Sequence, residues 1–312
     1  MNTPSPRLPK GKRLRYLSEA CALWLAFRLF RLLGLPASSA LGGCLARLIG
    51  PLTPLSRIAR QNLQAVFPDM PPRQRRHVIS GMWNNIGRVI AEYPHLDQLR
   101  LYDTKGRYPH RVIVKNKARL EALCAADKPV VFVSAHYGNW EMSALCVTQL
   151  GYPLTVVYRP PNNPLVDSML APLRASLSTY FAPKNDTVGS KRLVKAMRNK
   201  EAIGFVADQR TITDFSIPFL GHASGTLDAP AKLALHFKAP LVPVMIERTR
   251  KSHFILTVEE PLPVPTHADT KKNIYDLTLS MHQRFEAWIL SQPEQWLWIH
   301  NRWTFTLPPE KA

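Results

Sequence analysis

One hexapeptide combines the residue types and the spacing of an acid–base site: His136-Tyr137-Gly138-Asn139-Trp140-Glu141. A carboxylate near a histidine can accept the Nδ1 proton, fix the tautomer and leave Nε2 as a base. Gly138 allows the backbone to turn tightly or to approach a substrate closely. The hexapeptide therefore predicts a general base, His136, that is oriented by Glu141. For the hexapeptide alone, a structural histidine beside a surface glutamate is the alternative.

The segments on either side of the hexapeptide predict where His136 lies. Residues 129–134 are apolar and largely β-branched, which is typical of a buried strand. Residues 142–150 have helical spacing, and Gly151-Tyr152-Pro153 ends that pattern. We therefore expect His136 in the turn at the carboxyl end of a strand, where open α/β sheets commonly hold catalytic side chains.

Strand and helix patterns alternate from residue 111 onward. Strands are predicted at 111–114, 129–134, 154–158, 202–206, 241–246 and 254–258, and helices at 117–125, 142–150, 165–180, 190–200, 229–238 and 273–290. Residues 57–100 have a helical pattern with a break at Phe67-Pro68-Asp69. This order predicts an α/β fold in which helices flank a mainly parallel central sheet.

Polar residues follow several of these strands: His136 with Glu141, Arg159, Asp208 with Gln209, and Glu247. Because parallel strands end at one edge of a sheet, we expect these side chains to converge on one cleft. The sequence contains no G-x-S-x-G elbow, Walker loop, G-x-G-x-x-G or H-E-x-x-H motif. The histidines and carboxylates also lack metal-ligand spacing. These patterns predict a transfer reaction without metal or cofactor, in which His136 activates the acceptor.

The N-terminal region combines basic and apolar residues. Residues 1–15 are polar and basic, and we expect little fixed structure there. The apolar stretch 17–35 is interrupted by Glu19, Arg28 and Arg31, which argues against a signal peptide. The interruptions also leave fewer than the roughly 18 uninterrupted apolar residues of a spanning helix. We therefore predict a helix that lies in the cytoplasmic leaflet of the membrane.

The side chains expected to insert into that membrane are Trp24, Phe27 and Phe30. An amphipathic core helix and a short or tilted span are the alternatives. The predicted division of the chain is a basic tail at 1–16, a membrane-associated helical segment at 17–56 and a catalytic domain at 57–306.

Net charge and cysteine content limit the kinds of partner and the compartment expected for this 312-residue chain. Its formal net charge is +19. Such a basic chain favours an acidic partner. The charges are spread rather than gathered in a stripe with aromatic residues, and no nucleic-acid-binding motif occurs, so nucleic acid is not expected. The four cysteines form no C-x-x-C pair and are interpreted as reduced thiols in the core of a cytosolic-facing protein.

Several motifs resemble the late-acyltransferase family of lipid A biosynthesis, of the lauroyl/myristoyl type within the lysophospholipid acyltransferase superfamily. In the family's order they are residues 136–141, Tyr158-Arg159-Pro160-Pro161-Asn162-Asn163-Pro164, Ala207-Asp208-Gln209, Pro218-Phe219-Leu220-Gly221 with Gly225-Thr226, and the Trp-rich segment 295–303. Asn62-Leu63 followed by Phe67-Pro68 matches the family's lead-in. The chain departs from the family pattern at Arg210 and Asn301, which concerns the substrate more than the reaction.

The resemblance implies transfer of a fatty acyl chain from an acyl carrier protein thioester to a hydroxyl of a lipid A precursor. It also implies a place at the cytoplasmic face of the inner membrane. His136 and Glu141 are then the catalytic pair, and an acidic carrier protein is expected to dock on basic helices such as 190–200. The expected substrate-binding residues are Gly138, Asn139, Arg159, Asp208, Gln209, Gly225 and Thr226.

Several of these residues, and both substrates, fit more than one role. Arg159, or backbone N–H groups near Gly138, can stabilise an oxyanion; Arg159 can also hold a phosphate or pair with Asp208. Gly225-Thr226 fits a turn or a phosphate cradle, and the Trp-rich segment fits core packing or lipid contact. Coenzyme A is the alternative donor, and a lysophospholipid, ornithine lipid or glycolipid is the alternative acceptor. A non-catalytic membrane or nucleic-acid-binding protein is the remote alternative.

Overall fold

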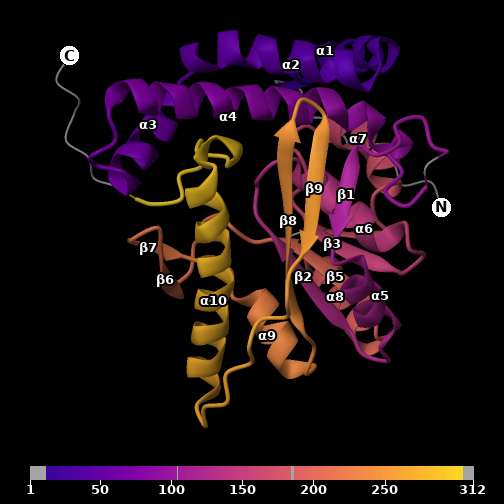
Figure 1. Cartoon of the computed structure of the whole chain (residues 1–312), viewed down its shortest axis with the longest axis vertical. Coiled ribbons are helices and arrows are strands. Elements are labelled where there is room, and N and C mark those ends of the chain that lie inside the picture. The colour runs from indigo at the N-terminus through magenta and orange to yellow at the C-terminus, as the bar shows by residue number, and fades with distance from the viewer. Residues whose placement is uncertain (1–11, 104, 184–185, 305–312) are drawn as a thin grey trace.

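The computed structural model of the chain describes residues 12–103, 105–183 and 186–304. In this part of the chain a seven-stranded sheet has the order β1-β9-β8-β2-β5-β3-β4 (Figure 1). The strands are β1 (Val112–Lys115), β2 (Val130–Ser134), β3 (Leu154–Tyr158), β4 (Tyr180–Pro183), β5 (Ala202–Val206), β8 (Leu241–Arg250) and β9 (His253–Val258). Neighbouring strands are parallel except β8 and β9. The predicted mainly parallel α/β fold is confirmed.

Strand β2 lies at the centre of this sheet, and all five of its residues are buried. Val131 and Val133 belong to one hydrophobic core, whereas Val130 and Phe132 belong to a second core. A strand in a parallel sheet covered on both faces has this continuous apolar character. The two covered faces fix the register of β2 and hence the place at which the chain leaves it.

The two cores correspond to two layers of helices. On one side, the buried residues come from α3 (Leu55–Val66), α4 (Pro72–Glu92), α8 (Thr187–Arg198), α9 (Ala229–His236) and α10 (Thr270–Ser291). On the other side, α5 (Lys117–Ala125), α6 (Leu145–Thr148) and the 3₁₀ turn η3 (Tyr93–Gln98) supply them. The remaining described helices are α1 (Arg13–Leu33), α2 (Leu35–Ile49) and α7 (Pro164–Ala175), with short turns η2 (Gly50–Leu52), η4 (Trp140–Ala144) and η5 (Pro293–Gln295).

Helices α1, α2 and α4 lie across the end of the sheet toward which β8 runs (Figure 1). Helices α2 and α4 approach closely because Gly42 and Gly87 face each other. A Cβ atom on Gly87 would lie 2.1 Å from the carbonyl oxygen of Gly42. The N-terminal helices are therefore packed directly above the carboxyl ends of the parallel strands.

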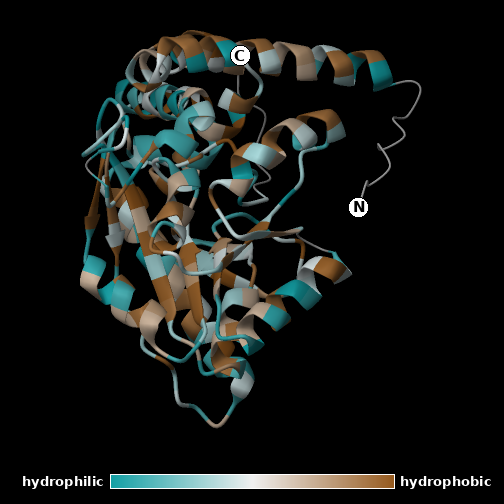
Figure 2. Cartoon of the chain, turned by 90° about the vertical axis from the view of Figure 1, so that its right-hand side faces the viewer, coloured by the Kyte–Doolittle hydropathy of each residue, from teal (hydrophilic) through white to brown (hydrophobic). Residues whose placement is uncertain are grey.

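Helix α1 begins at Arg13, inside the predicted 1–16 tail, and residues 1–11 of that tail lie outside the described residues. Apolar residues are frequent along α1, the helix at the top of the molecule in Figure 2. Among the described residues, no helix combines the length and the apolar character that a membrane span requires.

The expected membrane-inserting side chains of α1 need a correction. Phe30 is buried, and Phe27 stacks on Tyr93 with ring centroids 6.1 Å apart, so both face the protein. Trp24 is exposed, as expected. The exposed stripe consists instead of residues at helical spacing: Leu14, Leu17, Cys21, Leu25, Leu29 and Leu32. Cys21 and Cys44 are exposed, so the prediction of core thiols is wrong for these two cysteines.

Other local predictions differ from the structure where packing overrides the pattern. The helix expected at 142–150 is the 3₁₀ turn η4 followed by the four-residue α6. The helix expected at 165–180 ends at Ala175, and residues 180–183 form the edge strand β4. A separate hairpin of β6 (Ser216–Phe219) and β7 (His222–Gly225) was not predicted, because neither short strand is an apolar, β-branched run and Pro218 interrupts the first.

Candidate active site

The predicted catalytic loop leaves β2 after Ser134 and is held by distant parts of the chain. Gly138 has φ +57°, and a Cβ atom there would lie 2.0 Å from the carbonyl oxygen of Ile246. Only glycine fits such a close approach in this conformation. The N–H of Leu297 donates to the carbonyl of His136 at 3.2 Å, and the N–H of Gly138 donates to the carbonyl of Gln295 at 3.1 Å. The loop is therefore fixed between β8 and the segment after α10.

Asp208, at the end of β5, orients the imidazole of His136. Nδ1 of His136 donates to Oδ1 of Asp208 at 2.7 Å, and the His136 backbone N–H donates to Oδ2 at 2.9 Å. Nε1 of Trp296 also donates to Oδ2, at 2.7 Å. Burial opposes the charged carboxylate, but the positive charge of His136 and these hydrogen bonds outweigh burial and hold the pKa of Asp208 well below its usual range. A charged Asp208 thus fixes the Nδ1–H tautomer.

Nε2 of His136 is left as an acceptor on the opposite edge of the ring. The side-chain amide of Gln209 donates to this atom at 3.2 Å and to Nε2 of His300 at 2.8 Å. Burial and the nearby His136 charge lower the pKa of His300 to about 4, so its imidazole is neutral near pH 7. His136, His300 and the Gln209 amide therefore form the polar edge of the site. A substrate hydroxyl group that displaces the Gln209 amide can donate a hydrogen bond to Nε2 of His136.

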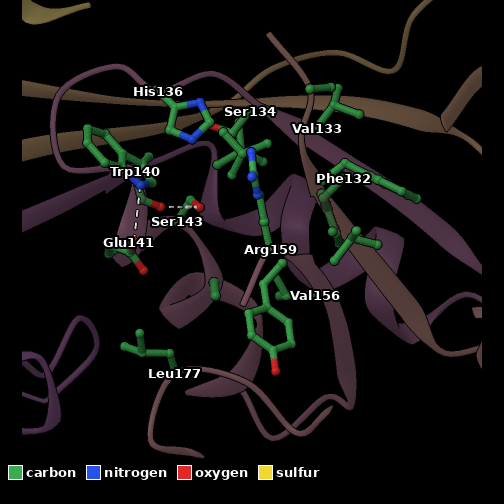
Figure 3. Close-up of a pocket in the computed structure, with 18 of the residues that line it drawn as sticks. Phe132, Val133, Ser134, His136, Trp140, Glu141, Ser143, Val156, Arg159 and Leu177 are labelled. Atoms are coloured by element: carbon green, nitrogen blue, oxygen red, sulfur yellow. Dashed lines mark hydrogen bonds between the residues drawn. The ribbon is translucent and has the colours of Figure 1, made fainter. Parts of the chain in front are cut away.

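Glu141 does not occupy the place predicted for it. Its Oε1 accepts a hydrogen bond from Nε1 of Trp140 at 3.1 Å, and the Trp140 ring lies edge-on to the His136 ring (Figure 3). Removal from bulk water raises the pKa of Glu141, while the charges of Arg174 and His136 oppose this shift. The prediction that Glu141 orients Nδ1 is corrected, because Asp208 already occupies that nitrogen. The catalytic role of Glu141 stays a prediction.

A cavity of about 420 Å³ lies at this end of the sheet, between β2, β3, β5 and α7 (Figure 3). His136, Glu141, Arg159 and Gln209 all contribute to its wall, so the predicted convergence of strand ends is confirmed for these residues. Most of the remaining wall is apolar: Phe132, Val133, Leu154, Val156, Val157, Leu177, Phe181, Phe205, Val206, Leu227 and Val244. The cavity combines a polar end with an apolar interior, which suits an amphiphilic substrate.

Two arginines add positive charge to this cavity. Arg159 is exposed, points toward the end where His136 lies, and pairs with no acidic group in the described part of the chain (Figure 3). Arg159 and Asp208 form no ion pair, so this alternative for Arg159 is wrong. Arg174, from α7, pairs with Asp167 at 2.5 Å and lies over the Tyr158 ring at 4.8 Å. Arg159 is therefore available to an anionic oxygen of a substrate.

Four predicted binding residues lie away from the cavity. Gly138 and Asn139 are buried behind the loop, and the N–H of Gly138 is already bonded, so it is not free to stabilise an oxyanion. Gly225 and Thr226 accept hydrogen bonds from the buried Arg302, through the Gly225 carbonyl at 2.9 Å and Thr226 Oγ1 at 3.0 Å. This arrangement favours a turn over a phosphate cradle.

Glu247 and the tryptophans of the Trp-rich segment, the remaining candidates, lie outside the cavity wall or in the core. Glu247 accepts a hydrogen bond from Nε2 of Gln292 at 2.6 Å and does not line the cavity. Trp296, Trp298 and Trp303 are buried, so these side chains pack in the core.

Three features of the site were not assigned from the sequence. Asp208 was expected to bind substrate rather than to orient His136, because sequence spacing alone favoured Glu141. His300 lies within the Trp-rich segment and Arg174 within an ordinary helical pattern, so neither position indicates a role in the site. The sequence did place Asp208 at the end of a predicted strand. That strand is β5, which pairs with β2 and so brings Asp208 beside His136.

Comparisons with known proteins agree over most of the chain. Residues 8–304 match the family model described as bacterial lipid A biosynthesis acyltransferase. The lipid A biosynthesis palmitoleoyltransferase of Escherichia coli (strain K12) is 24% identical over 255 residues, which are 78% of this chain and 77% of the relative. The lipid A biosynthesis lauroyltransferase of the same strain is 24% identical over 263 residues, 82% and 80% of the two chains. A lipid A biosynthesis acyltransferase of Haemophilus influenzae is 23% identical over 266 residues, 82% and 79%.

The lowered pKa of His300 predicts a pH-dependent stability. Between pH 6.5 and about pH 4 the unfolded chain binds a proton at this residue that the folded chain excludes, so stability falls as the pH falls. Over this range the loss from His300 amounts to at most about 3 kcal/mol. We expect His300→Gln, which retains an acceptor near Nε2, to lose this part of the pH dependence. Free energies of unfolding of both proteins across this range check it; parallel curves would contradict the prediction.

Proposed function

The chain belongs to the bacterial lipid A biosynthesis acyltransferase family, and we propose that it moves a fatty acyl chain from an acyl carrier protein thioester to a hydroxyl of a lipid A precursor. The relatives' names describe acyl transfer in lipid A biosynthesis. The observation that carries the proposal for this chain is the imidazole of His136, held by Asp208 and turned toward a largely apolar cavity. Acyl transfer needs both a base and room for a hydrocarbon chain.

In the proposed reaction, Nε2 of His136 takes the proton of the acceptor hydroxyl while the oxygen attacks the thioester carbonyl. Asp208 stabilises the resulting imidazolium. The tetrahedral intermediate then collapses, the carbon–sulfur bond breaks, and the imidazolium returns its proton to the leaving thiolate. Glu141 adds a negative charge near the imidazolium when it is ionised.

Arg159 is the cation best placed to meet an anionic oxygen in this reaction. Its guanidinium is exposed, unpaired among the described residues and directed toward the His136 end of the cavity. Guanidinium groups bind oxyanions and phosphates through charge-assisted hydrogen bonds. We propose that Arg159 binds either the tetrahedral oxyanion or a phosphate of one substrate.

We propose α8 as the surface on which the acidic carrier protein docks. Lys191, Lys195 and Arg198 lie at i, i+4 and i+7 and are exposed. Arg192, which was included in the predicted surface, instead lies over the Tyr180 ring at 3.2 Å from its centroid. Three exposed cations on one helix face attract an acidic partner, and this attraction weakens as salt rises.

The assay that tests the function supplies the purified protein with acylated carrier protein and a lipid A precursor. We expect the precursor to gain the mass of one acyl chain, and the kcat/KM for the carrier donor to fall at high salt. Acyl-coenzyme A and a lysophospholipid serve as the competing donor and acceptor. No transfer to the lipid A precursor, or a clear preference for either competitor, would contradict this form of the proposal.

Substitutions within the site test the assignment of the base and its partner. We expect His136→Ala to lower kcat by at least ~10²–10⁴-fold, the usual effect of removing a general base. Asp208→Asn, which favours the wrong tautomer, should be nearly as harmful. Glu141→Gln should be harmful but milder, because Glu141 does not contact Nδ1. An inactive Glu141→Gln protein beside an active Asp208→Asn protein would restore Glu141 as the partner of His136.

We also propose that α1 and α2 lie on the cytoplasmic face of the inner membrane. Leu25, Leu29 and Leu32 on α1 are 60%, 49% and 84% exposed, and arginines flank them. Leu48 and Ile49, at the carboxyl end of α2, are also exposed apolar residues. A lipid A precursor stays in the bilayer, so an enzyme that holds this surface to the membrane meets its acceptor there.

Replacing Leu25, Leu29 and Leu32 together with serine tests this surface. We expect at least ~10-fold weaker binding to anionic vesicles, because less apolar area is removed from water. Activity on bilayer acceptor should fall more than activity on detergent-dispersed acceptor. A triple serine variant of the exposed Ile113, Ile212 and Val264 is the matched control. Equal vesicle binding by both triple variants would show that α1 is not the anchor.

A further inference from the structure

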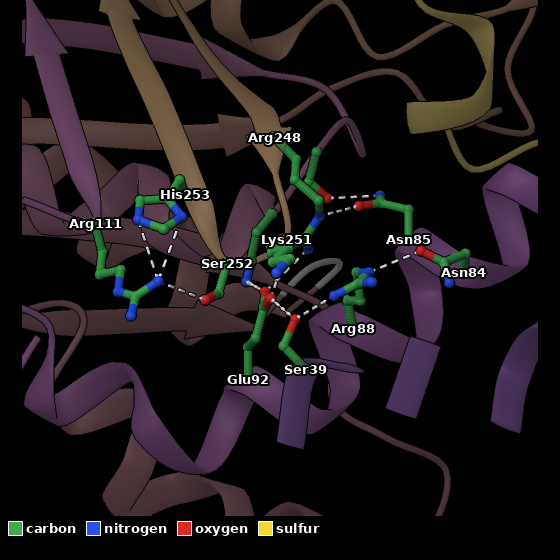
Figure 4. A network of polar contacts seen from close by, with 12 residues as sticks. Ser39, Asn84, Asn85, Arg88, Glu92, Arg111, Arg248, Lys251, Ser252 and His253 are labelled. Carbon is green, nitrogen blue, oxygen red and sulfur yellow. Dashed lines mark hydrogen bonds and ion pairs between the residues drawn. The ribbon is translucent and has the colours of Figure 1, made fainter. Parts of the chain in front are cut away.

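A buried carboxylate, Glu92, lies at the end of α4 and gathers donors from three other parts of the chain (Figure 4). Ser39 of α2 donates to Oε1 at 2.6 Å. Arg248 of β8 donates to both oxygens, at 2.5 Å and 3.0 Å. Nδ2 of Asn139 donates to Oε2 at 2.7 Å. One charged side chain thus connects α2, β8 and the catalytic loop.

A second connection runs from the same cluster to the same loop. Nε of Arg248 donates to Oδ1 of Asn85 at 2.9 Å, which fixes the orientation of the Asn85 amide (Figure 4). Nδ2 of Asn85 then donates to the carbonyl of Gly138 at 2.9 Å and to that of Gln295 at 3.3 Å. Gly138 and Asn139 are therefore held from the rear by two neighbouring polar groups of α4.

The position of these contacts in the loop gives them a consequence for the site. Gly138 and Asn139 lie between His136 and Glu141, which both line the cavity, whereas Asn85, Glu92 and Arg248 do not line it. A displacement of residues 138 and 139 moves the flanking side chains on the cavity side. Reaction rates are sensitive to such displacements, since an error of about 1 Å can cost about 10²-fold.

A buried ion pair is weak evidence for a contribution to stability, because desolvation offsets much of its attraction. Its specific geometry is stronger evidence for a positioning role. Each oxygen of Glu92 accepts from Arg248 and from one further donor, so the carboxylate has one favourable orientation. That orientation directs Oε2 at Asn139.

We propose that Glu92, Arg248 and Asn85 are positioning residues that hold the catalytic loop from behind and so set the place of His136. This inference rests on the proposed acyl transfer and deepens it. It explains why the polar groups of Gly138 and Asn139 face away from the substrate cavity.

An exchange of the two partners tests the proposal. In Glu92→Gln, an amide N–H group faces the Asn139 amide or one of the other donors. In Asn139→Asp, two carboxylates face each other. The double variant restores an amide–carboxylate hydrogen bond and the charge beside Arg248. We expect kcat to fall by about 10–10²-fold in each single variant, with little change in KM for the donor, and to recover most of the loss in the double variant.

Hydrogen exchange supplies a readout that does not depend on activity. The peptide that contains residues 136–141 should exchange faster in both single variants and return toward the wild-type rate in the double variant. Glu259→Gln is the matched control, because Glu259 also pairs with an arginine, Arg284 at 2.7 Å, away from the loop. The control should leave kcat and loop exchange unchanged.

Two results would overturn the proposal: wild-type kcat and loop exchange in the single variants, or losses that simply add in the double variant. If a single variant fails to fold, Asn85→Ala removes the hydrogen bond to Gly138 and must lower kcat and speed exchange. A wild-type protein without acyl transfer would instead refute the proposed function, while the exchange rates would still decide whether the cluster holds the loop.

Discussion

The hydrogen bond from Nδ1 of His136 to Oδ1 of Asp208 is the interaction on which the rest of the site depends. This bond joins the ends of β2 and β5, which are parallel neighbours in the sheet. The pairing of these two strands therefore brings the two side chains within hydrogen-bond distance. Asp208 stays charged although it is buried, because it accepts hydrogen bonds from His136 and Trp296 and attracts the imidazolium that forms when His136 takes a proton. The tautomer that results leaves Nε2 facing Gln209 and the cavity. A single pairing therefore determines which nitrogen can act as a base.

The fold supports this pairing from both sides of the loop. From one side, Trp296 and Leu297 bond to Asp208 and to the His136 carbonyl, and the Trp-rich segment is buried in the core. From the other side, α4 presents Asn85 and Glu92 to Gly138 and Asn139. Because α4 packs closely on α2 through Gly87 and Gly42, the helices proposed to meet the membrane belong to the same rigid support. The site is thus built from segments that are far apart in the sequence.

The sequence predicted the parts of this arrangement that depend on local pattern. The apolar run before His136, the strand at 154–158 and the strand at 202–206 predicted a parallel sheet and the convergence of His136, Arg159 and Gln209. The partner of His136 was not predictable from spacing, because it depends on which strands are neighbours, and spacing favoured Glu141. Phe27 and Phe30 were assigned to the membrane for a related reason: hydrophobicity alone does not distinguish a side facing protein from a side facing lipid. The role of Glu92 depends on contacts that no local pattern contains.

The tautomer of His136 provides the most direct measurement of the central claim. Side-chain ¹⁵N spectra of the purified protein at alkaline pH distinguish a proton on Nδ1 from a proton on Nε2. With Asp208 as the acceptor, we predict that the His136 proton resides on Nδ1 in the wild-type protein and moves toward Nε2 in Asp208→Asn. A wild-type ring protonated on Nε2, or a ring whose tautomer does not respond to Asp208→Asn, would contradict the account.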